Sequence, residues 1–403
     1  MTNNQNQPKQ YDAVLGGNAP PPIHSAVLGG IEGVKKRLAS SDVDVQIKAL
    51  NDVLNYGDEG LDLVVDALQT KPRIVRKSAY RLLRDKNVTK AEKMLWHYGV
   101  CYQRVYETLN DEYMYLPFEE FYNREVKVYD SKIGIDNTDN NAYVIDENNF
   151  DSLLKEPLGN KIEALIFRGE YPSSFIFSSN IVSNFKALFI GAYEISNYND
   201  IYFFPIWNIS LILKAYPKLE FLQLRCGENY SRPWRYFKKF RHNHLRTLIL
   251  ETKGLSSQKI TQILTLNFPA LEHLELWIGG NYSYGNYSIE HLTPILSGKI
   301  FPKLYYLGLR DCGYADEIAE AIVDSPIINK IKILDLSMGY LTDEGATALL
   351  NCPAINDLDI LNVANNCLSK EMVDKLMQLD TEVVADNQDI HKIVSNRYEE
   401  IWE

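Results

Sequence analysis

The chain lacks the short motifs that mark the common enzyme classes. Its 403 residues contain no HExxH, GxSxG or P-loop pattern. The seven His residues are scattered and give no metal-ligand spacing. We therefore expect a protein that is not an enzyme and that carries no cofactor and no metal.

Cysteine is scarce and does not form a recognisable framework. The five Cys are odd in number and widely spaced, and no CxxC pair is present, which excludes a zinc knuckle and argues against a disulfide scaffold. Cys312, Cys352 and Cys367 lie in apolar repeat contexts, where we expect small buried hydrophobic side chains rather than reactive thiolates.

Positive charge is in deficit, and long apolar runs are missing. The 42 Lys and Arg against 53 Asp and Glu give a net charge of −11, which argues against a nucleic-acid or anionic-membrane partner. No run of 18 apolar residues occurs, and the first residues do not read as a signal peptide. We expect a cytoplasmic protein. Its 45% hydrophobic residues are ordinary for a globular chain.

What the sequence does have is a repeat. Short apolar runs, most of them LxxLxL, recur between residues 162 and 366. Their marker leucines are separated by 23, 34, 26, 26, 33, 27 and 27 residues, close to the spacing of leucine-rich repeats. These markers are Leu165, Leu188, Leu222, Leu248, Leu274, Leu307, Leu334 and Leu361.

Helical patterns fill the intervals between these runs, over 260–269, 289–296, 315–323 and 343–350. A proline recurs before the next strand, at Pro217, Pro269, Pro302 and Pro353, where it ends the helical stretch. The repeated unit is therefore strand, turn, helix, strand. The sequence predicts an α/β leucine-rich-repeat solenoid, with parallel strands on the concave face and helices on the convex face.

The N-terminal part has a different pattern, which predicts a second, all-α module. Residues 30–108 show no strand signal and indicate helices near 31–39, 43–55, 59–69, 73–84 and 89–108, which fit a HEAT-like stack. We divide the chain into a flexible tail (1–29), the HEAT-like module (30–108), a linker and cap (109–160) and the leucine-rich-repeat domain (161–403). In the cap, 124–130 and 141–146 are expected to pair as a hairpin over the first repeat.

The repeats resemble ribonuclease-inhibitor-type leucine-rich repeats, through LEHLELWIGG, FPKLYYLGLRDC and ILDLSMGYLTDEGATALLNCP. The stretch 118–403, including the closing RYEEIWE, also resembles a bacterial leucine-rich-repeat family of unknown function. YDAVLGGNAPPP and AVLGGIEGVKKRLAS are similar to N-terminal modules of varied cyanobacterial proteins. The resemblance implies a fold and a scaffold-like binding style, not a reaction.

Side-chain alternation along each strand predicts which residues face the concave surface. In repeats three to seven this surface carries mixed charges and two large aromatic side chains, a composition typical of protein interfaces. We expect it to bind a partner protein through Gln223, Arg225, Glu251, His273, Glu275, Trp277, Tyr306, Arg310 and Asp335. The alternative is that these residues only form salt bridges between neighbouring strands on a solvent-exposed face. Catalysis by its carboxylates is disfavoured, because the repeat itself places acidic residues on neighbouring strands.

Two further segments carry hypotheses. The pentapeptide AVLGG occurs at 13–17 and at 26–30. Because glycine lets another backbone approach closely, an alternative function is that of a client or adaptor of a peptidase that recognises Leu15, Gly16, Gly17, Leu28, Gly29 and Gly30. The basic, aromatic run 232–244 has the composition of a single-strand nucleic-acid binder, but the acidic domain around it favours packing of its aromatic rings on the solenoid.

Overall fold

The computed structural model describes residues 30–70, 73–84, 104–105, 120–122, 124–146, 148–168, 184–191, 209–226, 240–252, 254–279 and 289–390. Its contacts divide the chain into two compact units, Met1–Val100 and Cys101–Glu403. Arg104 and Val105, which matter below, belong to the second unit.

The described part of the first unit is helical. It contains α1 (Gly30–Leu38), α2 (Val43–Val53), the 3-10 turn η1 (Leu54–Tyr56), α3 (Gly57–Thr70) and α4 (Arg73–Arg84). The carboxylate of Asp42 caps α2 by accepting from the backbone N–H groups of Asp44 and Val45. The helices expected at 31–39, 43–55, 59–69 and 73–84 are therefore present, whereas of the helix expected at 89–108 only Arg104 and Val105 are described.

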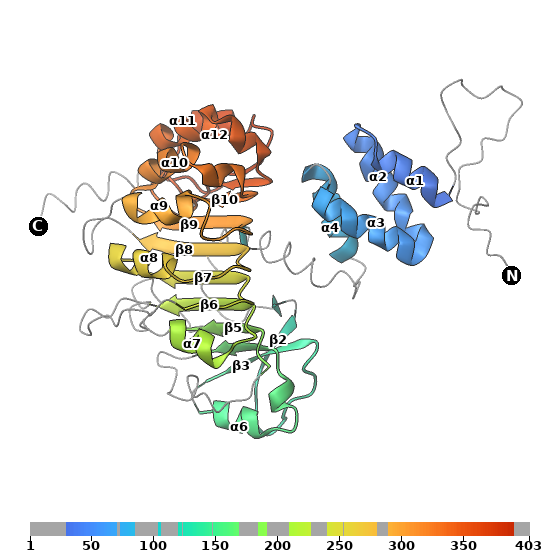
Figure 1. Ribbon diagram of the computed structural model, residues 1–403, viewed down its shortest axis with the longest axis vertical. Coiled ribbons are helices and arrows are strands. Elements are labelled where there is room, and N and C mark those ends of the chain that lie inside the picture. The colour runs from blue at the N-terminus through green and yellow to red at the C-terminus, as the bar shows by residue number, and fades with distance from the viewer. Residues whose placement is uncertain are drawn as a thin grey trace, which may run out of the picture. The chain divides into compact units, whose positions relative to one another are not determined.

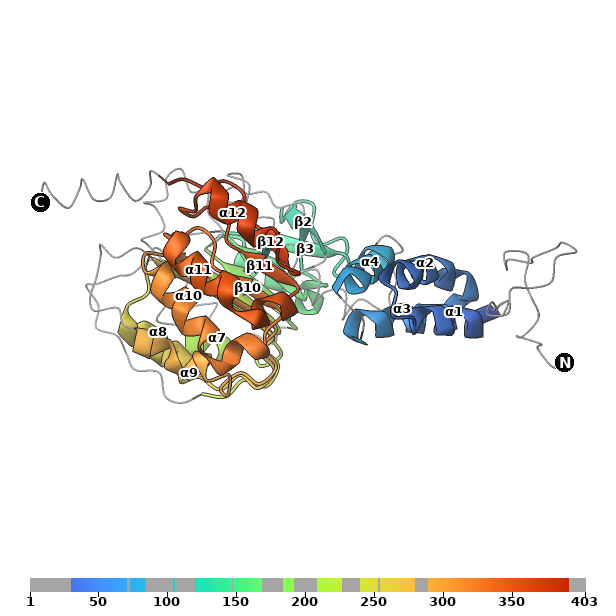
Figure 2. The same ribbon diagram turned by 90° about the horizontal axis from the view of Figure 1, so that it is seen from above.

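Among the described residues of the second unit, twelve strands form one sheet in chain order. Figure 1 shows the middle strands stacked one above the other, and Figure 2, turned by 90°, shows helices α8, α10 and α11 to one side of strands β10, β11 and β12. The strands are β1 (Glu120–Phe121), β2 (Arg124–Val128), β3 (Asn141–Ile145), β4 (Ala164–Phe167), β5 (Ala187–Ile190), β6 (Phe221–Cys226), β7 (Thr247–Thr252), β8 (His273–Gly279), β9 (Tyr306–Cys312), β10 (Ile333–Asp335), β11 (Ile360–Asn362) and β12 (Glu382–Val384).

The helices alternate with these strands, as the repeat predicts. They are α6 (Phe150–Lys155), α7 (Ile209–Ala215), α8 (Ser257–Leu264), α9 (Thr293–Leu296), α10 (Ala315–Val323), α11 (Asp343–Asn351) and α12 (Lys370–Leu376), joined by the 3-10 turns η4 (Gly159–Lys161), η8 (Ile289–Leu292), η9 (Pro326–Asn329) and η10 (Pro353–Asp357). Pro326 and Pro353 are each the first residue of a 3-10 turn, a position whose backbone N–H would have no acceptor within the turn.

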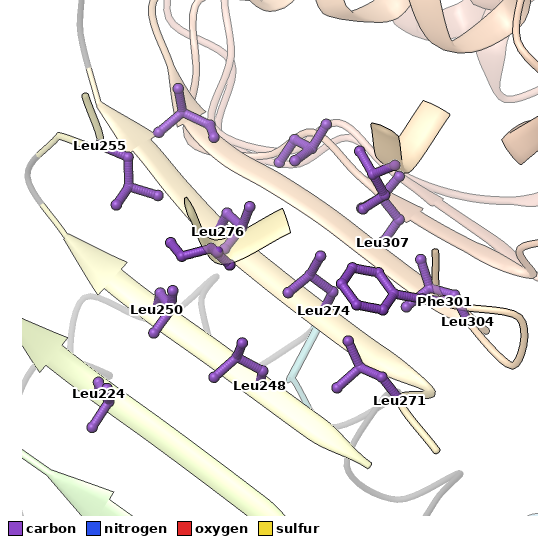
Figure 3. Close-up of a cluster of buried hydrophobic side chains, with 14 of the residues drawn as sticks. Leu224, Leu248, Leu250, Leu255, Leu271, Leu274, Leu276, Phe301, Leu304 and Leu307 are labelled. Carbon is purple, nitrogen blue, oxygen red and sulfur yellow. The ribbon is translucent and has the colours of Figure 1, made fainter. Parts of the chain in front are cut away.

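The eight marker leucines form one row across the sheet. Each is the register partner of the next, from Leu165 opposite Leu188 to Leu334 opposite Leu361. All eight are fully buried in a core shared with the helices, part of which Figure 3 shows around Leu248, Leu274 and Leu307. Burying one such side chain contributes roughly 1.5–3 kcal/mol, so the row is a main source of the unit's stability. The second unit is therefore an α/β fold whose strands run parallel from β2 to β12, which is consistent with the predicted leucine-rich-repeat solenoid.

The two ends of the sheet differ from the prediction. β2 and β3 do pair, but in parallel, with Glu125 opposite Asn141, so the expected hairpin between 124–130 and 141–146 is wrong. The intervening residues 129–140 are long enough for the return path that a parallel pair needs. The antiparallel pair lies one strand earlier, between β1 and β2. At the other end β12 continues the parallel sheet beyond the last expected strand.

Candidate functional site

Each central strand presents two faces of different chemistry. In β7 and β8 the leucines Leu248, Leu250, Leu274 and Leu276 belong to the core shared with the helices. The alternating residues point the other way, to what we call the strand face, because successive side chains of a strand lie on opposite sides of the sheet. At β5 and β6 this face is aromatic: the ring of Phe121 lies 5.3 Å from Phe221 and 6.4 Å from Phe189, centroid to centroid.

From β6 to β10 the strand face carries the residues that the sequence predicts for partner binding. The parallel register places Arg225 opposite Glu251, His273 opposite Tyr306, and Trp277 opposite Arg310. Their side chains interact across the strands, together with a few neighbours, in what we call the strand-face cluster. It comprises Gln223, Arg225, Glu251, His273, Glu275, Trp277, Tyr306, Arg310, Asp335, Ser337 and Asn362, together with Arg104.

Glu251 is held by two donors from the neighbouring strand. Gln223 donates through Nε2 to Oε1 at 2.8 Å, and Arg225 donates through Nε to Oε2 at 2.7 Å. The Arg225 guanidinium also lies 5.4 Å from the centre of the Phe189 ring, so it links the charged and aromatic parts of the strand face.

Glu275 is the centre of the strand-face cluster. The indole Nε1 of Trp277 donates to its Oε1 at 2.7 Å, and Arg310 approaches the same oxygen at 3.4 Å. The imidazole Nε2 of His273 lies 3.7 Å from Oε2, and the His273 ring stacks on Tyr306 with 3.8 Å between centroids. Gly308 leaves room for this packing: a Cβ there would lie 3.1 Å from Cγ of Glu275.

Asp335 closes the cluster on the next strand. Its Oδ2 accepts from the Tyr306 hydroxyl at 2.7 Å and from Asn362 Nδ2 at 2.9 Å. Its Oδ1 accepts from the backbone N–H of Ser337 at 3.0 Å and from its hydroxyl at 2.6 Å. Both carboxylate oxygens of Asp335 are therefore held by donors from β9, from β11 and from Ser337, which follows β10.

One member of the cluster comes from outside the repeats. Arg104 Nη2 lies 2.6 Å from Glu251 Oε1 and 2.6 Å from Glu275 Oε1, while its Nε donates to Glu275 Oε2 at 2.8 Å. The guanidinium therefore bridges two carboxylates on neighbouring strands and contacts both oxygens of Glu275. Sequence reasoning missed this residue, because Arg104 is 147 and 171 residues distant from its partners and lies in no motif.

The cluster is buried, although the sequence suggests a solvent-facing surface. Glu251, His273, Glu275, Tyr306, Arg310 and Asp335 are 0% exposed, and Gln223, the most exposed of the nine predicted residues, is 5% exposed. The structure thus brings all nine together and removes them from solvent. Buried charges of this kind are tolerated because each is paired and hydrogen-bonded.

Burial and pairing set the protonation states in the cluster. Burial acts to raise the pKa of Glu275, but the guanidinium groups of Arg104 and Arg310 outweigh it and hold that pKa well below its usual value. The pKa of Glu251 is lowered against burial by Arg225 and Arg104. Burial lowers the pKa of His273, and burial with the nearby Asp335 carboxylate raises that of Tyr306. At neutral pH the glutamates are charged, and His273 and Tyr306 are neutral.

The other sequence candidates are only partly described. Of the AVLGG residues, Gly30 begins α1, and Leu15, Gly16, Gly17, Leu28 and Gly29 lie outside the described residues. So do Trp234, Tyr236 and Phe237 of the basic run, whereas Phe240 packs against the core. Cys312 and Cys367 are buried as expected, and Cys352 is partly exposed.

Other kinds of candidate site are few among the described residues. No helix there is long and apolar enough to cross a bilayer, and no three or more His, Cys, Asp or Glu side chains are grouped so that they could hold a metal ion. One open cavity of about 410 Å³ lies beside the strand starts and is lined by Thr138, Asp139, Lys161, Glu163, Asn184, Lys186 and Lys218.

Comparison with known proteins supports the fold and assigns no function. No family model matches the chain, and no curated protein matches it. Among solved structures, a structural-genomics protein from Bacteroides fragilis is 25% identical with a TM-score of 0.52, over 60% of this chain and 70% of that one. An internalin from Listeria monocytogenes is 10% identical with a TM-score of 0.26, over 61% of this chain and 78% of that one.

Proposed function

We propose that the protein is a non-enzymatic interaction module whose leucine-rich-repeat strand face binds a partner protein. The observation that supports it is the strand-face cluster itself: six consecutive strands, β6 to β11, contribute charged, aromatic and amide side chains in register. The core shared with the helices consists of leucines and other apolar side chains and does not include this polar layer. The face of a solenoid that carries such a layer is the usual place for recognition.

The chemistry of the cluster favours recognition over catalysis. A general acid or base needs a pKa near the working pH, whereas Glu251 and Glu275 are held ionised by guanidinium groups. The carboxylate oxygens are already occupied by donors from Arg104, Gln223, Arg225 and Trp277. Such an arrangement leaves the carboxylates no proton to donate and makes them weak bases.

The proposal includes the finer assignments that follow from the sequence. The nine predicted residues, which are at most 5% exposed, are the recognition residues and contact the partner once the strand face is uncovered. The helical first unit is a HEAT-like module, and the protein acts in the cytoplasm as a scaffold. The net charge of −11 supports a protein partner rather than nucleic acid.

Affinity capture from the native host tests the partner assignment. The full chain, the Glu251→Gln/Glu275→Gln variant and the control Glu371→Ala are used as baits; Glu371 is an exposed residue of α12. A partner of the strand face is retained by the wild type and the control and is lost with the double variant. Partners retained equally by all three baits, once circular dichroism has shown that each is folded, would contradict the proposal.

The alternative, a client or adaptor of a peptidase that reads AVLGG, rests on the duplicated pentapeptide. It predicts loss of an N-terminal peptide ending at Gly17 or Gly30 in host lysate. Intact-mass measurement after incubation checks it, and an unchanged mass would exclude it.

A further inference from the structure

The described strand residues of the cluster do not balance their own charge. Glu251, Glu275 and Asp335 are negative, and Arg225 and Arg310 are positive, while His273 and Tyr306 are neutral because of burial. The described strand residues therefore contribute three carboxylates and two guanidinium groups. Burying a carboxylate without a paired cation is costly, and Arg104 adds a third guanidinium group that contacts Glu251 and Glu275.

The place of that cation is shaped by the strands. Glu251 is fixed by Gln223 and Arg225, and Glu275 by Trp277, through contacts that do not involve Arg104. Oε1 of Glu251, which also accepts from Gln223, and both oxygens of Glu275, of which Oε1 also accepts from Trp277, all contact the Arg104 guanidinium. The planar fork of a guanidinium suits two neighbouring carboxylates, whereas an ammonium contacts them only as a point charge.

We propose that the Glu251–Glu275 pair is an arginine-recognition site, that Arg104 occupies it as an intramolecular ligand, and that the partner protein engages the strand face by placing an arginine side chain there instead. This rests on the proposed function and names the chemistry of the partner. A partner's arginine meets the same two carboxylates, already oriented, and restores the charge balance that the departure of Arg104 removes. Arg104 consequently competes with the partner's arginine. The wild-type protein therefore binds the partner more weakly than a protein whose site is not occupied by Arg104.

The full-length Arg104→Ala variant tests the site without any knowledge of the partner. Removal of Arg104 should lower the melting temperature, and ethylguanidinium should raise it again in a concentration-dependent way, because a ligand that binds only the folded state stabilises it. Ethylammonium at the same concentration is the matched probe and should restore much less. Wild type and the Arg104→Ala/Glu251→Gln/Glu275→Gln variant should respond equally little to both probes.

A peptide measurement tests recognition of protein arginine and competition by Arg104. Acetyl-Ala-Arg-Ala amide should bind Arg104→Ala and should bind wild type about tenfold or more weakly, because the site is competent only in the fraction of molecules that Arg104 has left. Acetyl-Ala-Lys-Ala amide should bind neither detectably. If Arg104→Ala does not fold, Arg104→Gln replaces it, and the readout becomes refolding on addition of ethylguanidinium.

Equal effects of guanidinium and ammonium probes, or no response of either variant to ethylguanidinium, would overturn the arginine-recognition site. That outcome is distinct from failure of the proposed function: a partner captured through the strand face by some other contact would leave the proposed function standing. Conversely, ethylguanidinium could rescue Arg104→Ala selectively while the Glu251→Gln/Glu275→Gln bait still captures the partner. That result would support an arginine-binding site but show that the partner does not place an arginine there, and it would overturn the last step of the proposal.

Discussion

At the scale of single residues, the strand face stays intact through pairing of every buried charge. The carboxylate of Glu275, for example, is contacted by three side chains, those of Arg104, Trp277 and Arg310. Gly308 is part of the same arrangement, because a methyl group there would also lie 2.9 Å from the Tyr306 ring. The sequence identifies the strand residues of this cluster from alternation alone. It does not identify Arg104, because nothing local marks which distant arginine will complete a buried charge.

The buried imidazole of His273 makes stability depend on pH. Its pKa is lowered from 6.5 by burial, so the unfolded state binds the proton more readily than the folded state. This contribution to stability is complete above about pH 6.5 and is lost as the pH falls toward the lowered folded pKa. Glu275 acts in the same direction below its ordinary value of 4.5, since its folded pKa is lowered too.

We expect His273→Phe, which keeps a ring stacked on Tyr306, to reduce the loss of unfolding free energy between pH 6.5 and pH 5.5. Urea denaturation at a series of pH values measures it. His242, whose pKa burial also lowers, supplies a remaining slope in the variant. An unchanged slope in His273→Phe would mean that this imidazole is not buried in its neutral form.

At the scale of elements, the leucine spacing was sufficient to predict the eight strands from β4 to β11 and their register. The predicted runs around Leu248, Leu274 and Leu307 are the strands β7, β8 and β9, because their periodicity fixes both the strand and the buried face. The ends were harder. β2 and β3 carry no LxxLxL pattern, and Tyr143 takes the place of a marker leucine opposite Leu165, so their parallel pairing could not be read from the motif.

Neighbouring helices are tied by a repeated cap that the sequence analysis also missed. Asp316 of α10 accepts from the backbone N–H and the hydroxyl of Thr342, the N-cap of α11. One repeat later, Asp343 of α11 accepts in the same way from Ser369, the N-cap of α12. Each aspartate thus satisfies donors at the start of the next helix.

We expect Asp316→Ala to lower the free energy of unfolding by about 1–2 kcal/mol, the usual cost of losing a helix cap. Chemical denaturation measures it. The control is Glu371→Ala in α12, which removes an exposed ion pair with Lys375 and should leave the unfolding midpoint unchanged. Equal effects of the two substitutions would contradict the capping role of Asp316.

At the scale of the whole molecule, composition and repeats predicted an all-α segment followed by a leucine-rich-repeat solenoid. The described residues show helices in the first unit and, in the second, a long parallel sheet with helices that is consistent with a solenoid. The exposure of the strand face could not be predicted in this way. The alternation of side chains along a strand predicts which face of the sheet each side chain lies on. Whether that face is exposed depends on segments far away in the sequence that pack against it, such as the one that carries Arg104. The predicted recognition residues were therefore found together but buried.

The central claim is that Arg104 completes the charge balance of the strand face, and a double-mutant cycle with Arg104→Ala and Glu275→Gln tests it most directly. Unfolding free energies of the wild type, both single variants and the double variant give the coupling, with Lys375 and Glu371 as an exposed control pair. The account predicts a coupling of about 1–3 kcal/mol between Arg104 and Glu275 and none in the control. Additivity of the Arg104 and Glu275 effects within about 0.3–0.5 kcal/mol would contradict it.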